Sequence, residues 1–434
     1  MTGGIIALEP SDLYDSGYSI GVRVFSNSWG TSYRSGAHYE GANTDMYLYD
    51  HTDVIIIFAA GNDGAGGAGT CSMESQLKNV VSVGSSQSTL NSENIDYVSW
   101  FSSRGPSFDK RIKPDIVAPG DSLRSAKANS ASTLPSNSNS NSNSNHAVAG
   151  GSCDTVIKSG TSMAAPVVAG SALLIRQYFI DERQRFWTQS CRPQYNRICR
   201  STVPSGVLLK AAILHSGTSA SMVGVEDSDS AFYYYEVETT LSNTPDNFQG
   251  YGRVFLQNIL PLKGKFDFDL YFDDLRAINE NSDIVYYVNV LDSTRPLKVT
   301  LSWYDPPGID GLSTQSLIHD LDLRVDAPPR EKRILISNNV TAGKGNDRGS
   351  NSSNEIEENA KEEEEEEEED GVLLGNNRLL SEGPDKINNN EQIFVGNPRA
   401  GQWTVTVSTK ALPYSGQQHF SIVITSNGEV SDTF

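Results

Sequence analysis

The chain has 434 residues, of which 37% are hydrophobic, so it is long enough for two or three domains with sizeable cores. Its net charge of −20 is unevenly spread, because residues 355–370 hold twelve acidic residues against one lysine. The lack of a basic patch argues against nucleic acid as a partner, and no apolar run approaches the length of a membrane span.

The first part of the chain alternates short apolar runs with helical stretches. Strands are predicted at Ile20–Phe25, Val54–Ala60, Asn79–Ser85 and Asp115–Asp121, and helices at Asn43–Asp53, Met163–Ile180 and Pro204–Gly217. Apolar runs that end in Gly, Asn or Asp turns are typical of buried parallel strands. Pro166 lies in the first turns of its helix, where a missing N–H costs least, and Gly217 is expected to cap the last helix. The pattern predicts an α/β fold.

From about Gly264 the pattern changes to short alternating runs separated by turn residues. Seven such runs predict an antiparallel β-sandwich. We place the domain boundary near residue 260, which gives an α/β domain at 1–260 and an all-β sandwich domain at 261–434.

Three segments have the composition of insertions. Residues 128–146 are a Ser/Asn low-complexity loop, residues 181–203 are polar, and residues from about 340 to 390 contain eight consecutive glutamates. The acidic run is interpreted as a solvated, disordered loop rather than a metal-attracting patch. No C-x-x-C pair occurs, and Cys191 and Cys199 are either a local disulfide or two free thiols.

Three short stretches could carry chemistry. In "SGTSMAAP", Ser162 opens a helix, where backbone N–H groups and the helix dipole favour negative charge. In "AAGNDG", Asn62 ends a buried strand and could donate to an oxyanion, and in "SNSWG", Gly30 would let an extended peptide approach. Each has an ordinary structural explanation when taken alone: a helix cap, a turn asparagine and a packed tryptophan.

Taken together and in this order, the three stretches resemble the subtilisin-like serine proteases, or subtilases. "FSSRGP", "KPDIVAPG" and "GYGRV" also match that family, and "VTLSWYDPPG", "HDLDLRV" and "GQWTVTV" resemble the C-terminal sandwich of its long alkaline members. The resemblance implies a partial subtilisin-like parallel sheet with flanking helices, followed by the sandwich.

The resemblance also implies a role for each matching residue. Ser162 would be the acyl-forming nucleophile, and the Asn62 side chain with the Ser162 N–H would form the oxyanion hole. The substrate cleft would be lined by Ser28, Trp29, Gly30, Ala60 and Gly61. The substrates would be polypeptides, and the motifs do not indicate which side chain the pocket accepts.

The catalytic Asp and His motifs of the family are missing. They should precede the S-W-G segment, yet only 27 residues precede Ser28 and none of them is histidine. Asp15-Ser16-Gly17 imitates the Asp motif, but no apolar strand leads into it and it leaves no room for a histidine helix. None of the six histidines is followed by Gly-Thr.

We therefore interpret the chain as an N-terminally truncated subtilase, or as one that has lost its base. It should hydrolyse peptides only weakly alone, and an unpaired sheet edge should make it aggregate. A pseudoprotease that binds extended peptides is the alternative. An α/β-hydrolase is disfavoured, because that fold places its Asp and His after the serine.

No cofactor is needed for serine chemistry, but structural calcium is common in the family. Asp305, Asp320 and Asp322 form a possible oxygen-rich site, although strand-end acids explain them equally well. The N-terminus has no signal peptide, and two sequons, at Asn339 and Asn351, fit secretion. An extracellular or secretory location is expected from the family.

Overall fold

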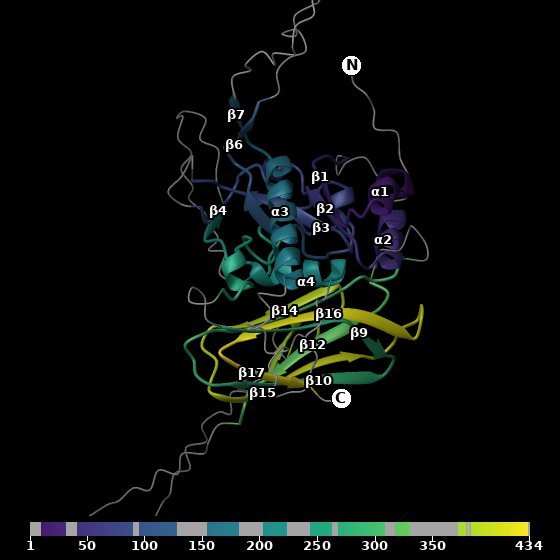
Figure 1. Ribbon diagram of the computed structural model, residues 1–434, viewed down its shortest axis with the longest axis vertical. Helices are drawn as coiled ribbons and strands as arrows, with labels where there is room; N and C mark the ends of the chain where they lie inside the picture. Colours follow the sequence, from purple (N-terminus) through teal and green to yellow (C-terminus); the bar gives the residue numbers. More distant parts are fainter. Residues whose placement is uncertain are drawn as a thin grey trace, which may run out of the picture.

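A computed structural model describes residues 10–31, 41–89, 95–127, 154–181, 203–223, 244–262, 268–308, 317–329, 372–378, 381 and 383–432 (Figure 1). The predicted insertion at 128–146, nearly all of that at 181–203, and Cys153, Cys191 and Cys199 lie outside these residues.

The first layer is a mainly parallel sheet of six strands. They are β1 (Val24–Asn27), β2 (Ile55–Ala59), β3 (Val81–Ser86), β4 (Tyr97–Val98), β5 (Ile116–Pro119) and β8 (Met222–Val223). The pairs β1/β2, β2/β3, β3/β5 and β4/β8 are parallel, and β4 is antiparallel to β3. Every residue of β2 is buried, as its uninterrupted apolar sequence predicted. A separate hairpin pairs β6 (Leu123–Ala126) with β7 (Thr155–Lys158).

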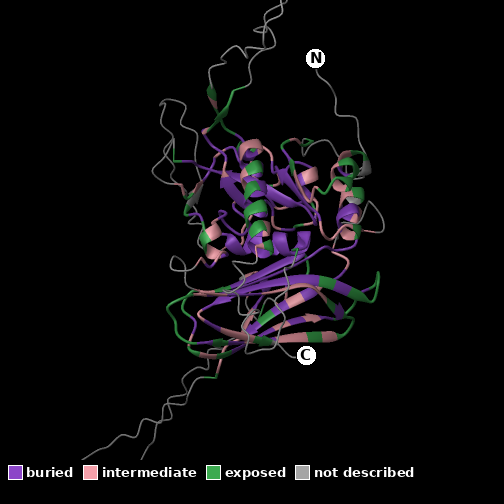
Figure 2. Ribbon diagram, viewed as in Figure 1, coloured by how far each residue is buried: buried purple, intermediate pink, exposed green. Residues whose placement is uncertain are grey.

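Four helices among the described residues accompany the sheet: α1 (Pro10–Ser19), α2 (Gly41–Asp50), α3 (Thr161–Ile180) and α4 (Gly206–Ser216). Single 3-10 turns occur at Gly64–Gly66, Glu74–Gln76, Leu256–Asn258 and Gly375–Asn377. α3 lies along one face of the sheet and buries Ala165, Val168 and Ala172 in the main core, while Figure 2 shows its other face exposed. By length and composition α3 could cross a membrane, but half of that stretch is buried, as in a core helix.

The second part is the expected antiparallel sandwich. One sheet has the order β13 (Val372–Leu374), β12 (Leu321–Asp326), β15 (Gly401–Thr409), β10 (Ser282–Val290) and β17 (Gly428–Asp432). The other has the order β14 (Asn390–Val395), β11 (Leu297–Trp303), β16 (Gln417–Ser426) and β9 (Asp269–Asn279). Along β15 the residues alternate between buried and half-buried, which is the two-residue period that predicted it. A second apolar core fills the space between the sheets.

α4 joins the two parts, because it lies between the parallel sheet and the sandwich (Figure 1). All of its residues are buried, including His215, whose ring nitrogens contact the hydroxyls of Thr300 and Thr425 in the sandwich at 2.9 and 2.8 Å. A fully buried ion pair, Lys78 Nζ to Asp305 Oδ2 at 2.6 Å, crosses the same junction.

Two sequence predictions need correction, and the expected cap at Gly217 is confirmed with a different backbone angle. The strand predicted from Ile20 starts only at Val24, because α1 continues to Ser19 and Gly21 turns the chain at a φ of +97°; Ile20 is 83% exposed. Gly217 does end α4, but at a φ of −55° rather than in the left-handed region. It must be glycine for another reason, because a Cβ there would lie 2.0 Å from the Tyr251 carbonyl oxygen.

The acidic insertion is also shorter than predicted at its C-terminal end. β13 pairs with β12, and Asp385 and residues 388–390 are buried in the sandwich. These polar residues bond one another: Asp385 accepts from the side-chain amides of Asn376 and Asn388 at 2.6 and 2.8 Å. A loop-like composition here encodes a buried polar network.

Candidate active site

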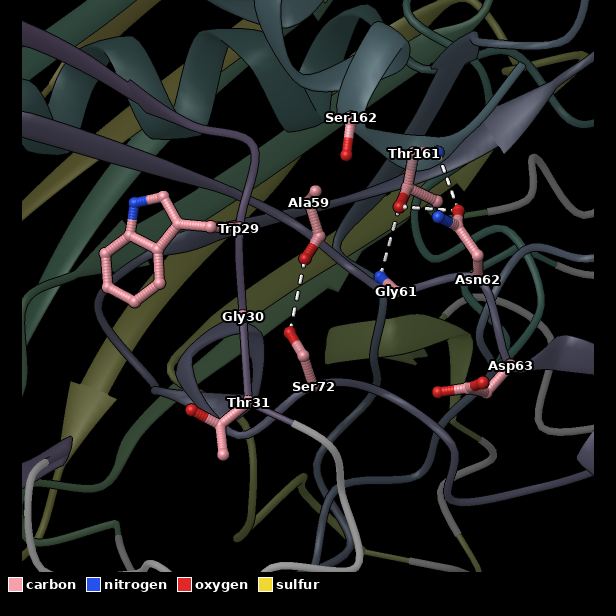
Figure 3. Close-up of a pocket in the computed structure, with 10 residues that line it drawn as sticks. All are labelled: Trp29, Gly30, Thr31, Ala59, Gly61, Asn62, Asp63, Ser72, Thr161 and Ser162. Atoms are coloured by element: carbon pink, nitrogen blue, oxygen red, sulfur yellow. Dashed lines mark hydrogen bonds between the residues drawn. The ribbon is translucent and has the colours of Figure 1, made fainter. Parts of the chain in front are cut away.

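A cavity of about 330 Å³ opens where β1, β2 and the start of α3 meet (Figure 3). It is lined by Trp29, Gly30, Thr31, Ala59, Gly61, Asn62, Asp63, Ser72, Thr161 and Ser162. The polar ends of parallel strands and the N-terminus of a helix therefore face one space, which is where open α/β sheets bind ligands.

Ser162 lies in the first turn of α3 and is half-buried. Its N–H has no intrahelical partner at this position, so it can donate to a group in the cavity. The Ser162 hydroxyl donates to the Ser28 carbonyl oxygen at 3.3 Å, and the Ser28 hydroxyl donates to the Ser162 carbonyl oxygen at 2.8 Å. The loop after β1 is thus held directly against the serine.

Asn62 is fixed against the same helix start, 99 residues away in sequence. Its Oδ1 accepts from the Thr161 N–H at 2.9 Å and from the Thr161 hydroxyl at 3.0 Å. The Thr161 hydroxyl in turn accepts from the Gly61 N–H at 3.2 Å. Because Oδ1 is occupied, the Asn62 Nδ2 is left as a donor, and Figure 3 shows it on the side of Ser162 and Gly61.

The predicted cleft residues do not all line the cavity. Trp29, Gly30 and Gly61 do, whereas Ser28 is exposed and is not among the lining residues, although its hydroxyl donates to the Ser162 carbonyl oxygen. Ala60 is fully buried, with its N–H bonded to the Val83 carbonyl, and Ala59 takes its place in the lining. Adjacent residues at the end of a strand point to opposite faces, which explains the one-residue shift.

Sequence reasoning missed Asp63, Thr31 and Ser72. Asp63 directly follows Asn62 at the carboxyl end of β2, and this position was a usable signal. Ser72 has no such signal, since it reaches the cavity through a loop in which its hydroxyl donates to the Ala59 carbonyl at 3.3 Å. The neighbouring Cys71 is no rival nucleophile, because burial raises the pKa of its thiol to about 12.

No histidine among the described residues lies at Ser162. His51 stacks on Tyr47, His215 is enclosed at the sandwich junction, and His319 contacts the Gln418 side chain at 2.7 Å. His419 is on β16, while His38 and His146 fall outside the described residues. Asp15 is exposed in the middle of α1, which agrees with its rejection as the catalytic aspartate.

The aspartates considered for calcium do not form a site. Asp305 uses one oxygen for the Lys78 ammonium and the Ile318 N–H, and the other for the His319 N–H. In the part of the chain that the structure describes, no group of three or more His, Cys, Asp or Glu is arranged to hold a metal ion. Asp305, Asp320 and Asp322 therefore do not fit a shared ion.

Comparison with known proteins gives a family match. Residues 4–252 match the model of the Subtilase family. The serine protease AprX of Bacillus subtilis (strain 168) is 35% identical over 125 residues, covering 29% of this chain and 26% of AprX. The serine protease/ABC transporter B family protein tagA of Dictyostelium discoideum is 23% identical over 397 residues, covering 72% of this chain and 20% of tagA. The chain thus spans about a quarter or less of these relatives.

Solved structures are also similar, at low scores. The prenylagaramide maturation protease PagA gives a TM-score of 0.35 at 19% identity, covering 59% of this chain and 67% of PagA. The Aeromonas sobria serine protease, solved with its chaperone, gives 0.35 at 14% identity, covering 97% of this chain and 74% of that chain.

Proposed function

The chain belongs to the subtilase family of serine proteases, and from this premise we propose that it is a serine endopeptidase whose nucleophile is Ser162. The observation that supports the proposal is that Ser162 and Asn62 line one cavity, with Asn62 bonded to the residue before the serine. A peptide carbonyl in this cavity would lie within reach of the hydroxyl that attacks it and of the groups that stabilise the product of attack.

In the proposed reaction the Ser162 Oγ attacks the scissile carbonyl carbon, and the oxyanion that forms accepts hydrogen bonds from the Ser162 N–H and the Asn62 Nδ2. The dipole of α3 adds a favourable potential at the same point. Losing an oxyanion asparagine costs about 3–4 kcal/mol of transition-state stabilisation, a value measured in subtilisin itself.

The attacking hydroxyl must also lose its proton. Among the described residues the Ser162 hydroxyl donates to a carbonyl oxygen, which cannot take the proton away. We therefore propose that these residues alone hydrolyse peptides slowly, through oxyanion stabilisation and binding. The same observation favours a second candidate, a pseudoprotease that binds extended peptides between Ser28–Gly30 and Gly61.

A fluorophosphonate tests the proposal, because the serine oxygen displaces fluoride from phosphorus and stays covalently attached. We expect slow labelling at Ser162 that added imidazole accelerates, since imidazole can accept the hydroxyl proton. S162A should abolish labelling, and S171A, which removes a hydroxyl from the same helix, should not. Labelling that survives S162A would refute the nucleophile, and no labelling with imidazole present would support the pseudoprotease.

An extracellular or secretory location remains part of the proposal. It is supported by the two Asn-x-Ser/Thr sequons at Asn339 and Asn351. Glycan occupancy of these asparagines, measured by mass spectrometry on the protein from its own source, tests it.

A further inference from the structure

Small residues form much of the wall of the cavity beside Ser162. Gly30 faces Ser72 so closely that a Cβ on Gly30 would lie 2.7 Å from the Ser72 Oγ. Gly61, at a φ of +112°, and Ala59 form the facing wall. At about 330 Å³, and lined in part by backbone and small side chains, the cavity has room for one long side chain.

The charged side chains that the structure describes at this cavity, Asp63 and Glu74, are both acidic. Asp63 is exposed and belongs to the lining, and Figure 3 shows its carboxylate turned toward the side of Ser72. Glu74 lies directly behind the opposite wall, where one carboxylate oxygen would be 3.2 Å from a Cβ on Gly30 and accepts from the Thr31 N–H at 2.7 Å. None of the lining residues that the structure describes is lysine or arginine.

We infer that this pocket selects a lysine or arginine side chain on the acyl side of the cleaved bond, with Asp63 as the residue that determines the preference. The inference rests on the proposed function, since it takes the Ser162 cavity as the substrate pocket. The methylene groups of such a side chain would pack along Ala59 and Gly61, and its cationic end would meet the Asp63 carboxylate.

Other side chains fit this pocket less well for physical reasons. An apolar side chain would remove water from the Asp63 carboxylate without giving it a partner, and an acidic side chain would be repelled by both Asp63 and Glu74. Losing a hydrogen bond to a charged group inside a binding site lowers affinity more than losing an apolar contact of similar size.

Binding can be measured without any bond being cleaved. Four fluorescein-labelled tetrapeptides, Ala-Ala-Pro-X with X as Arg, citrulline, Leu or Glu, are titrated with the full chain and followed by fluorescence anisotropy. Citrulline has the shape of arginine without its charge. We expect the Arg peptide to bind at least about tenfold more tightly than the citrulline and Leu peptides, and the Glu peptide to bind most weakly. Arg-Ala-Pro-Leu, with the charge moved, should lose the advantage.

Variants assign the preference to one residue. D63N should reduce the ratio of Arg to citrulline affinity to about one, and D63K should make the Glu peptide the tightest binder. D50N, which removes an exposed carboxylate from α2, is the matched control and should leave the ratio unchanged. Equal binding of the Arg and citrulline peptides to the unmodified chain, or no binding of the Arg peptide, would overturn the inference.

The outcomes separate this inference from the proposed function. Selective binding of the Arg peptide without labelling of Ser162 would support the inferred preference of the pocket for a basic side chain and refute the proposed protease activity. Labelling of Ser162 together with equal binding of the Arg and citrulline peptides would support the proposed protease activity and refute the inferred preference for a basic side chain.

Discussion

Lys298 should make the stability of the chain depend on pH in a way that a single substitution removes. It lies on β11 and is 7% exposed, and its Nζ donates to the Gly217 carbonyl oxygen at 2.8 Å, across the junction with α4. Burial without an acidic partner lowers the pKa of Lys298 from 10.5 to about 7. The folded chain therefore keeps this amine neutral over a range in which the unfolded chain protonates it.

The sign follows from proton counting. Between pH 7 and about 10 the unfolded state binds one more proton at this site, so the free energy of unfolding rises with pH by about 1.4 kcal/mol per unit. Below pH 7 both states are protonated and the slope disappears. Across the whole window Lys298 costs on the order of 3–5 kcal/mol at neutral pH compared with pH 10 and above.

The K298M variant keeps the aliphatic stem and removes the amine. At pH 10 it should be less stable than the unmodified chain by about 1–3 kcal/mol, because the Gly217 carbonyl loses its donor. At pH 7 it should be more stable, because the cost of protonating a buried amine is gone. Urea unfolding between pH 6 and 10, followed by tryptophan fluorescence, measures both values.

The control is K158M, which removes an exposed lysine from β7 and should give a difference in unfolding free energy that does not reverse sign. Unfolding curves of K298M and the unmodified chain that keep the same separation from pH 6 to pH 10 would refute the reasoning. They would mean that water or a rearranged side chain reaches the ammonium in the folded state.

Two further stability predictions follow from buried contacts. Burial and the nearby Asp385 raise the pKa of Glu391 well above its ordinary value. Its contribution to stability is therefore full below pH 4.5 and is lost as the pH rises through the folded pKa. E391Q should reduce this decrease in the free energy of unfolding with pH, measured by urea titration. G206A should destabilise the chain by about 1–3 kcal/mol, because a Cβ would lie 1.9 Å from the Val54 carbonyl oxygen; G170A, where a Cβ meets nothing within 4 Å, should not lower the melting temperature.

The elements that sequence predicted best are those whose local pattern is decided by burial alone. β2 is apolar throughout, α4 is mostly apolar, and every residue of both is buried; α3 places Pro166 in its first turns, as expected. Ile20 was misplaced because an apolar residue in the turn just after a helix cannot be told from the first residue of a strand by hydrophobicity alone. The glycine one residue later decided the matter through its backbone angle.

The candidate site was predictable in part. Ser162 and Asn62 were predicted as site residues because their motifs resemble a known family, and the structure brings them to one cavity. Their actual link, from Asn62 Oδ1 to the Thr161 N–H, joins residues 99 positions apart and has no local signature. Asp63 was not predicted, because the motif that resembles the family ends at Asn62. Both residues nevertheless follow the same strand and line the same cavity.

The polar residues buried at the junction show a limit of composition-based boundaries. Asn389 lies in a run of polar residues, yet its side-chain amide donates to the Trp303 carbonyl oxygen at 2.9 Å and to the Asn79 Oδ1 at 3.1 Å. Such a residue is inside because each of its polar atoms has a partner there, and the partners come from both halves of the chain. Segment composition cannot report this, since the partners are more than 80 residues away.

α4 is a buried junction shared by two halves of different architecture, so we expect the halves to stabilise each other. A helix that is buried on every side needs two surfaces to cover it, and here α3 and the parallel sheet cover one side while β11 and β16 cover the other. Figure 2 shows α4 buried along its length. Each half alone would expose one side of α4 or the surface that receives it, and would leave His215 or Lys78 without its hydrogen-bond partners. The sandwich therefore stabilises the same sheet whose strand ends carry Asn62, and its contribution to the site acts through that sheet rather than through direct contact.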